Sequence, residues 1–526
     1  MNDDGQLLTE EERKAAYRRA WFGFIAMMFG NFMAILDIQI VASSLKEIQA
    51  GLSASADELT WVQTSYLIAE VIAIPLSGYL SRMMSTRIYF VMSAIGFTLA
   101  SLLCAFAWNI ESMIVFRVLQ GFLGGGMIPT TLGAIFLLFP PEKRQLPTVL
   151  VGLVMTTAPA LGPTLGGYLT AAFSWHWLFF INIIPGTLLS IVVWQNVRFD
   201  KPDWSLLRKI DLWGLLGMAL FLGSLEFVLD EGPRHDWFED ELVWRMFWVM
   251  LAGAALFFWR AFTAEHPIVE LRTYKNRNFV FGSIAAFVVG VMIFGMVYLV
   301  PTFLGGVRGY NSLQIGQTMM VMGVAMFSSA PLVGRLATKL DLRLLLAYGL
   351  SMVAVGTYLN AHLTADSGFW QFFWPQVMRG HGFMFCMITM TGLAMGTLSP
   401  DQVKNGSGLF NLMRNLGGAI GLALINTGLH ERSWFHYAHL SASINDARAP
   451  VQEALSNGSA LLRPELGGDA TAATLGRIAG LVQQQAAIMS FNDVMLVMSL
   501  LCAFAVLLLP FADKPQMLGA AGGGAH

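Results

Sequence analysis

The stretch Gly152 to Tyr168 reads GLVMTTAPALGPTLGGY. Its glycines and prolines stand inside a segment whose apolar character predicts a helix within a membrane. At that depth every backbone group needs a partner inside the protein, so such residues are tolerated only where neighbouring helices pack closely. Each proline also removes one helical hydrogen bond. The pattern predicts a bent, closely packed helix that moves, with the hinge candidates Gly152, Pro159, Gly162, Pro163, Gly166 and Gly167.

The composition indicates a protein that crosses a membrane many times. Charged residues make up 13% of the chain, whereas soluble domains carry about 25%. Apolar residues make up 55%, and the mean hydropathy is +0.58. A helix that crosses about 30 Å of hydrocarbon needs roughly 20 apolar residues, and about fourteen such segments fit between Trp21 and Phe511. We therefore expect an all-α polytopic membrane protein.

The distribution of basic residues predicts the orientation of the chain. Residues 1–20 are charged and hold no apolar core followed by a cleavage site, so the first span is expected to act as the insertion signal. With fourteen spans, most lysines and arginines of the loops fall on one side, among them Arg13, Lys143 and Lys275. The positive-inside rule then places both termini in the cytoplasm.

The arrangement of the spans divides the chain into five parts. We expect a cytoplasmic segment at 1–20, a first six-helix bundle at 21–198, a linker with two extra transmembrane helices at 199–277, a second bundle at 278–512 and a cytoplasmic tail at 513–526. The second bundle includes a long periplasmic loop at 430–487. Near its end Leu475, Ile478, Leu481 and Val482 recur at helical spacing. This apolar face packs either on a partner or on its own bundle and lipid, and both alternatives stay open.

Two ionisable residues of the first half are expected to lie at equal depth. Charged groups inside the membrane cost several kcal/mol unless they are paired or hydrated, so each one marks a functional candidate. Asp37 and Arg117 each lie roughly 9 Å below the outer surface, at 1.5 Å per residue. Because the loss of a partner changes how strongly a carboxyl holds a proton, this pair is a candidate for proton coupling. A static ion pair is the structural alternative.

Glu70 lies deeper, roughly 16 Å into the second span, and the adjacent sequence offers no cation at that depth. Three interpretations are open for it: a second proton carrier, a contact for a cationic substrate, or a neutral acid hydrogen-bonded to a neighbouring helix. Glu226 and Asp493 fall close to the outer surface. We expect these two carboxylates to be simply solvated.

A further polar region is expected in the second half. Arg379 and Arg414 lie too deep in their spans to reach the surface easily. They either line a pathway that attracts an anionic group or hold the second half together through backbone carbonyls, and the second role is favoured. His381 and Asn411 extend the same region, although a lone buried histidine is more often a satisfied core residue. Asn31 of the first span is another candidate for lining the pathway.

Several stretches resemble the motifs of one family. The stretch around Asp37 is similar to a first-span motif, the stretch at Arg117 to a fourth-span motif, and the run 152–168 to an antiporter motif that marks exporters. The stretches are GNFMAILDIQIV (30–41), RVLQGFLGGGMIP (117–129), WHWLFFINIIPG (175–186), LDEGPRHDWF (229–238) and the terminal GGGAH (522–526). Together they resemble the major facilitator superfamily and, within it, the fourteen-span drug:proton antiporters of the EmrB-like multidrug exporter type. In that family the arginine equivalent to Arg117 is associated with proton transfer.

One motif departs from this resemblance. The loop after the second span usually reads G-x-L-a-D-r-x-G-r in the superfamily, whereas GYLSRMMSTR (78–87) has Arg82 at the aspartate position and Ser85 at the second glycine. The charge-relay contact of that loop is therefore in doubt for this chain.

The resemblance implies a fold, an activity and partners. The fold is two six-helix bundles plus two additional central helices. The activity is export of hydrophobic and amphipathic toxic compounds, antibiotics among them, by alternating access around a midplane site. The proton gradient supplies the energy, and no cofactor is expected. The location is the bacterial inner membrane, within a tripartite pump that includes a periplasmic adaptor similar to EmrA and an outer-membrane channel similar to TolC.

Two alternatives stay open beside multidrug export. The same fold serves an exporter dedicated to one natural compound, such as a fatty acid, a bile salt or a siderophore, because pocket-forming methionines suit either role. An intramembrane enzyme is less favoured, since the chain has no HExxH pair and no phosphate-binding loop. The glycine-rich GFLGGG (121–126) is better explained by helix packing. Cys104, Cys386 and Cys502 are too few and too buried for a disulfide framework or a metal site.

Overall fold

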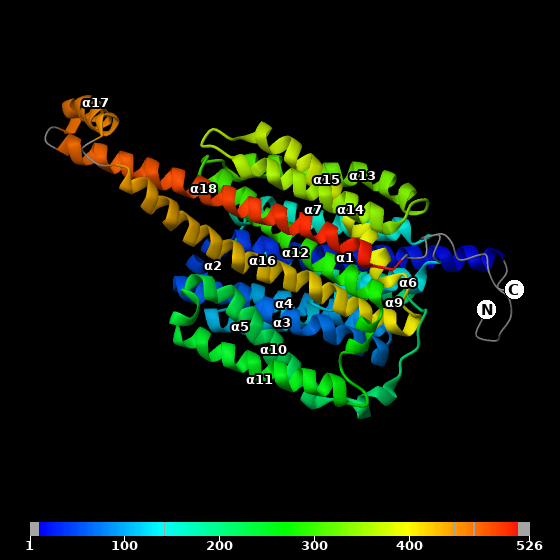
Figure 1. Ribbon diagram of the computed structural model, residues 1–526. Helices are drawn as coiled ribbons and strands as arrows, with labels where there is room; N and C mark the ends of the chain where they lie inside the picture. Colours follow the sequence, from blue (N-terminus) through cyan, green and yellow to red (C-terminus); the bar gives the residue numbers. More distant parts are fainter. Residues whose placement is uncertain (1–9, 141–142, 445–447, 467–468, 514–526) are drawn as a thin grey trace.

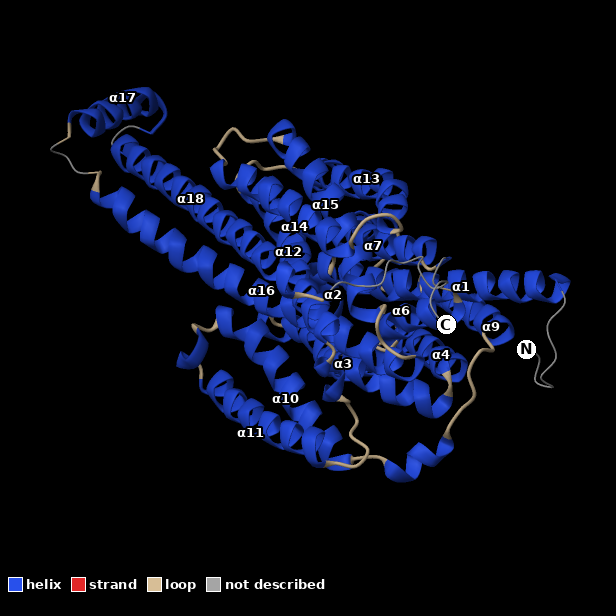
Figure 2. Cartoon of the chain, turned by 45° about the vertical axis from the view of Figure 1, so that its right-hand side comes forward, coloured by secondary structure: helices blue, strands red, loops and turns tan. Residues whose placement is uncertain are grey.

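A computed structural model describes residues 10–140, 143–444, 448–466 and 469–513. These residues are helical with short connections and contain no β-strand, which confirms the all-α class (Figure 2). The α-helices are α1 (Glu10–Ser43), α2 (Leu45–Leu52), α3 (Ala56–Met84), α4 (Thr86–Ala105), α5 (Ile110–Gly124), α6 (Met127–Leu138), α7 (Gln145–Ala172), α8 (Trp177–Phe180), α9 (Ile183–Asn196), α10 (Leu212–Glu231), α11 (Glu241–Thr263), α12 (Arg277–Gly306), α13 (Ser312–Ala337), α14 (Leu342–Leu359), α15 (Phe369–Met395), α16 (Pro400–Ala442), α17 (Ala449–Leu466) and α18 (Ala470–Leu508). Apart from Asp513, the expected tail at 513–526 lies outside the described residues, and so does the GGGAH motif.

The number of spans is consistent with the expected fourteen. Within the described ranges, 12 helices are long and apolar enough to cross a membrane, if α5 with α6 and α8 with α9 are each taken as one. The helices α7 and α15 are 28 and 27 residues long and lie packed among them. With these two, the total is fourteen.

The helix α7 lies where the two halves of the molecule meet. It packs on α1 of the first half and on α13 and α15 of the second. A side chain at Gly162 would overlap that of Gln39 on α1, so this glycine permits the close approach that the sequence predicts. Gly167 differs from the expectation, because a side chain there would meet open space. The side chains of Pro159 and Pro163 lie outside the described part of the structure, so the hinge remains a prediction.

Glycines also explain the break between α5 and α6. A side chain at Gly121 would overlap the backbone carbonyl of Tyr66, and one at Gly126 would overlap the hydroxyl of Tyr89. The glycine-rich stretch 121–126 therefore serves helix packing, as expected.

The two extra helices form an antiparallel pair at one flank of the bundle (Figure 1). The helix α10 packs on α3 of the first half and on α16 of the second, whereas α11 packs mainly on α10. The outer face of α11 is apolar and exposed, with Trp244, Trp248 and Phe262 more than 40% accessible. The pair thus covers one side of the junction between the halves.

The described part of segment 430–487, which we expected to be a long periplasmic loop, is mostly helical. The helix α16 continues for 43 residues, α17 follows, and α18 begins at Ala470. At 1.5 Å per residue, α16 is roughly 64 Å long, about twice the hydrocarbon thickness. Figure 1 shows α16 and α18 running side by side beyond the bundle to α17. Of the expected apolar face, Val482 is buried while Leu475 and Leu481 are exposed.

We expect the close packing of α10 on α11 to depend on one glycine. A Cβ at Gly217 would lie 2.6 Å from the backbone nitrogen of Phe257. Gly217→Ala should therefore push the helices apart and destabilise the protein by about 1–3 kcal/mol, measured as a lower melting temperature in detergent. Gly323→Ala is the matched control, since a Cβ there has open space and alanine favours the helix. Equal melting temperatures for the two variants would contradict the close packing.

Candidate functional site

A fully buried ion pair joins α1 to α5. Arg117 Nη1 donates to Asp37 Oδ2 at 2.6 Å, and both side chains are 0% exposed. The prediction from depth, that these two residues pair, is confirmed. Because buried charges are strongly unfavourable without partners, the contact ties the two helices together.

Two amides complete the surroundings of Asp37. Asn182 Nδ2 donates to Asp37 Oδ1 at 2.7 Å, and Gln120 Nε2 donates to the same oxygen at 3.0 Å. Gln120 Oε1 also accepts from Arg117 Nη1 at 2.6 Å. Asp37, Arg117, Gln120 and Asn182 are called the carboxylate quartet below. The sequence analysis missed both amides, although each is a polar residue in an apolar span and each lies within a quoted motif.

Arg117 is held by further contacts around the quartet. Its Nε donates to the carbonyl of Val62 at 3.0 Å, and its guanidinium lies 4.2 Å from the ring centroid of Tyr66. Its Nη2 has no hydrogen-bond partner in the described part of the chain. The arginine is thus fixed by α3 and α5, while the carboxylate receives its hydrogen bonds from α5 and from Asn182, which directly precedes α9.

A separate cavity lies between the halves. It measures about 130 Å³ and is lined from α1, α3, α6, α7, α10, α12, α15 and α16. Most of its wall is apolar, and Glu70 and Arg414 are two of its charged side chains. The sequence analysis found no cation for Glu70, but the fold brings one from α16 to the same cavity. Glu70 has no hydrogen bond in the described structure, so its interpretation as a hydrogen-bonded neutral acid is not supported.

Arg414 is positioned by side chains rather than by backbone carbonyls. Its Nη1 donates to Met155 Sδ of α7 at 2.6 Å, and its Nη2 donates to Asn411 Oδ1 at 2.5 Å. Asn415 Oδ1 lies 3.5 Å from the same Nη2. The expected bonding to carbonyls is therefore wrong for this residue. Its position in the cavity wall instead favours the pathway-lining alternative.

Two other candidates are buried away from this cavity. Arg379 is 0% exposed and reaches Met296 Sδ and Gln376 Oε1, both at 3.1 Å. It also makes no bond to a backbone carbonyl among the described residues, in contrast to the expectation. Asn31 Oδ1 accepts from Thr131 Oγ1 at 3.1 Å, and Asn31 is fully buried. Neither residue lines the central cavity.

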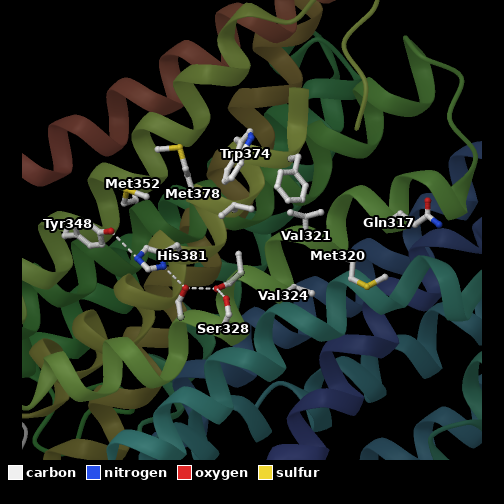
Figure 3. A pocket seen from close by; sticks show the side chains of 14 residues that line it. Gln317, Met320, Val321, Val324, Ser328, Tyr348, Met352, Trp374, Met378 and His381 are labelled. Carbon is white, nitrogen blue, oxygen red and sulfur yellow. Dashed lines mark hydrogen bonds between the residues drawn. The ribbon is translucent and has the colours of Figure 1, made fainter. Parts of the chain in front are cut away.

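His381 lies in a different pocket on the outer side of the second half. This pocket of about 640 Å³ is lined by α13, α14 and α15, and its rim residues Met320 and Trp374 are exposed. The hydroxyl of Ser329 lies 2.6 Å from Nδ1 of the imidazole, and that of Tyr348 lies 3.1 Å from Nε2. Figure 3 shows the Tyr348 side chain directed at His381. Both ring nitrogens are satisfied, as expected for a core histidine. The single polar region expected in the second half is thus divided among three places.

Two carboxylates differ from the expectation that they are simply solvated. Glu226 is only 7% exposed and lines the central cavity from α10. Asp493 of α18 accepts from Arg432 Nε and contacts His436 Nε2, both on α16 and both at 2.7 Å. Distance along a helix did not reveal these surroundings, because lateral packing decides them.

Charged side chains also join the halves near the loop 78–87. Arg82 of α3 pairs with Glu270, which precedes α12. Lys404 of α16 donates to Asp200 Oδ2 at 2.5 Å and to the carbonyl of Ser81 at 3.1 Å. Asn405 Nδ2 donates to the carbonyl of Glu270 at 3.1 Å. The sequence analysis doubted a charged contact here. The structure has one, between Arg82 in the last turn of α3 and Glu270 in the segment that joins α11 to α12.

We expect Arg82→Glu to loosen this junction, because it places two acids side by side. Ser407 lies on α16, faces Gly133 of α6 and is 2% exposed. In a background lacking the native cysteines, a cysteine at this position should then react several-fold faster with a maleimide. Arg82→Glu with Glu270→Arg should restore slow labelling. Arg245→Glu is the control, since Arg245 pairs with Glu241 within α11 alone. Unchanged labelling in Arg82→Glu would show that the pair does not hold the halves together.

Comparisons with known proteins define the class of this transporter-like bundle. A family model described as Major Facilitator Superfamily matches residues 27–422. The proton:xylose symporter XylE has the same fold, with a TM-score of 0.60 and 12% sequence identity over 95% of this chain and 98% of that structure. The chain therefore belongs to the Major Facilitator Superfamily.

Relatives within the superfamily narrow this assignment. The chain is 47% identical over 505 residues to the colistin resistance protein EmrB of Acinetobacter baumannii, covering 96% of this chain and 98% of that protein. It is 31% identical to the multidrug export protein EmrB of Escherichia coli, covering 95% and 97%. It is 30% identical to the fatty acid resistance protein FarB of Neisseria gonorrhoeae, covering 94% and 96%. The expected type, an EmrB-like exporter, is confirmed, and these relatives are transporters rather than enzymes.

Proposed function

We propose that this protein is a proton-driven antiporter that exports hydrophobic and amphipathic toxic compounds by alternating access. The names of the two EmrB relatives, colistin resistance and multidrug export, support this class of activity. The observation that carries the coupling step is the carboxylate quartet. Asp37 is a buried carboxylate whose hydrogen bonds come from two other helices.

The position of the quartet connects it to movement of the halves. Asp37 lies on α1, and α1 packs directly on α7, which also contacts the second half. If α7 shifts during a transport cycle, α1 shifts with it and moves Asp37 relative to Arg117, Gln120 and Asn182. A change in partners alters how strongly a carboxyl holds a proton. In this scheme Asp37 takes up and releases the proton, while Arg117 supplies the compensating charge.

A second candidate is an exporter dedicated to one natural compound. The relation to FarB favours a fatty acid among the candidates. The apolar wall of the central cavity suits either an acyl chain or the apolar part of a drug. The two functions differ in how many compounds are carried, and transport measurements separate them.

We further propose that the protein works in the bacterial inner membrane, with both termini in the cytoplasm, as part of a tripartite pump. Its partners there would be a periplasmic adaptor similar to EmrA and an outer-membrane channel similar to TolC. The hairpin of α16, α17 and α18 projects from the bundle, and this projection supports the proposal of a partner at the periplasmic side. Trp434 and Leu461 on this hairpin are 68% and 77% exposed. Large exposed apolar side chains mark interaction surfaces when they gather in patches.

Transport in everted proteoliposomes tests the proposed activity. An interior more acidic than the bath should drive uptake of hydrophobic toxic compounds, and collapse of the gradient should abolish it. Asp37→Asn should reduce the gradient-driven uptake rate at least tenfold, because the asparagine amide cannot bind and release a proton. Full gradient-driven transport by Asp37→Asn would refute Asp37 as the coupling carboxylate. Uptake of one compound class alone, such as fatty acids, would favour the dedicated exporter.

A further inference from the structure

The central cavity holds two carboxyl groups that lack partners. Glu70 comes from α3 and Glu226 from α10, and they are 5% and 7% exposed. Among the described residues neither has a hydrogen bond or an ion pair. Both line the same small cavity as Arg414. Their carboxyl groups are thus buried, without a hydrogen-bond or ion-pair partner in the described structure, and in the wall of one cavity.

The charges around this cavity do not balance. The carboxylate quartet is neutral by itself, since Asp37 and Arg117 compensate each other. In the cavity, Arg414 compensates only one of the two carboxyls. Asp230, one turn along α10 from Glu226, is also acidic; it bonds to Thr64 and lies 3.9 Å from Arg234. A carboxylate within a membrane is strongly unfavourable without a counter-charge. The cavity is neutral only when it takes up one further positive charge.

The rest of the wall indicates what kind of cation fits. Leu67, Phe294, Val297 and Met387 surround the carboxyls with apolar and aromatic surface. At about 130 Å³ the cavity can hold water, but it is smaller than the pockets of roughly 300–1,000 Å³ that bind drug-sized ligands. A larger ligand therefore needs the halves to separate first. While the halves are close together, a proton can supply the missing positive charge. When the halves are apart, a lipophilic cation can supply it.

We infer that Glu226 binds the cationic group of an amphipathic substrate, and that this group and a proton occupy the same uncompensated position in turn. The inference rests on the proposed function and specifies its substrate class as lipophilic organic cations. It also assigns a role to the extra helix pair. The helix α10 adds a second carboxyl to the one that Glu70 supplies from the first bundle, and it does so by packing on both α3 and α16.

Binding of tetraphenylphosphonium to the full-length protein in nanodiscs tests this inference. The wild type should bind the cation and release about one proton for each cation bound, and Glu226→Gln should weaken binding at least tenfold. Glu226→Asp should recover part of the affinity because it keeps the charge. Glu231→Gln is the matched control on the same helix, since Glu231 is also buried but pairs with Arg234 at 3.0 Å. Its affinity should stay within about twofold of the wild type.

The outcomes separate this inference from the proposed function. Absence of tetraphenylphosphonium binding by the wild type overturns the inference, and so does wild-type affinity in Glu226→Gln. Equal losses in Glu226→Gln and Glu231→Gln also overturn it, because they indicate a general disturbance of α10. If Glu226→Gln alone loses binding while wild-type proteoliposomes show no gradient-driven uptake, the cation site stands and the proposed antiport fails. The melting temperature of each variant shows whether it is folded.

Discussion

The requirement that every charge within the membrane be compensated governs this structure. Asp37 and Arg117 meet it by direct contact, and Gln120 and Asn182 fill the remaining hydrogen-bonding positions of the carboxylate. This arrangement fixes α1, α5 and α9 relative to one another, since removal of any partner leaves a buried polar group unsatisfied. The same requirement makes the unpartnered carboxyls of Glu70 and Glu226 significant. They line a cavity rather than a packed core.

Close packing at glycine determines where the halves touch. Gly162 brings α7 against α1, and Gly78 brings α3 against the backbone of α16 beside Lys404 and Asn405. Charged contacts lie beside the second of these junctions, where Arg82 pairs with Glu270 of the linker and Lys404 donates to the carbonyl of Ser81. Close backbone approach and partly exposed ion pairs are both contacts that can break without leaving a fully buried charge unpaired. They differ in this from the fully buried quartet, which lies wholly within the first half.

The two extra helices, α10 and α11, are part of the junction between the halves. The helix α10 bridges the two halves and carries Glu226 to the cavity, while α11 covers its outer side. Trp237, between the two helices, donates to Thr427 of α16 at 3.0 Å and so attaches their connection to the second half. The pair is therefore integrated with the cavity rather than only appended to the bundle.

Hydropathy, glycine spacing and depth along the helices were sufficient to predict the helical class, the approximate spans and the pairing of Asp37 with Arg117. These properties are local, because the membrane imposes one geometry on every apolar segment. The sequence alone did not predict the features that depend on contacts between helices far apart in the chain. The segment 430–487 is helical although it lacks the apolar character of a span. Glu226 lies in the cavity wall because of the lateral position of α10. Arg82 finds Glu270 188 residues away, and only the tertiary structure brings such distant groups together.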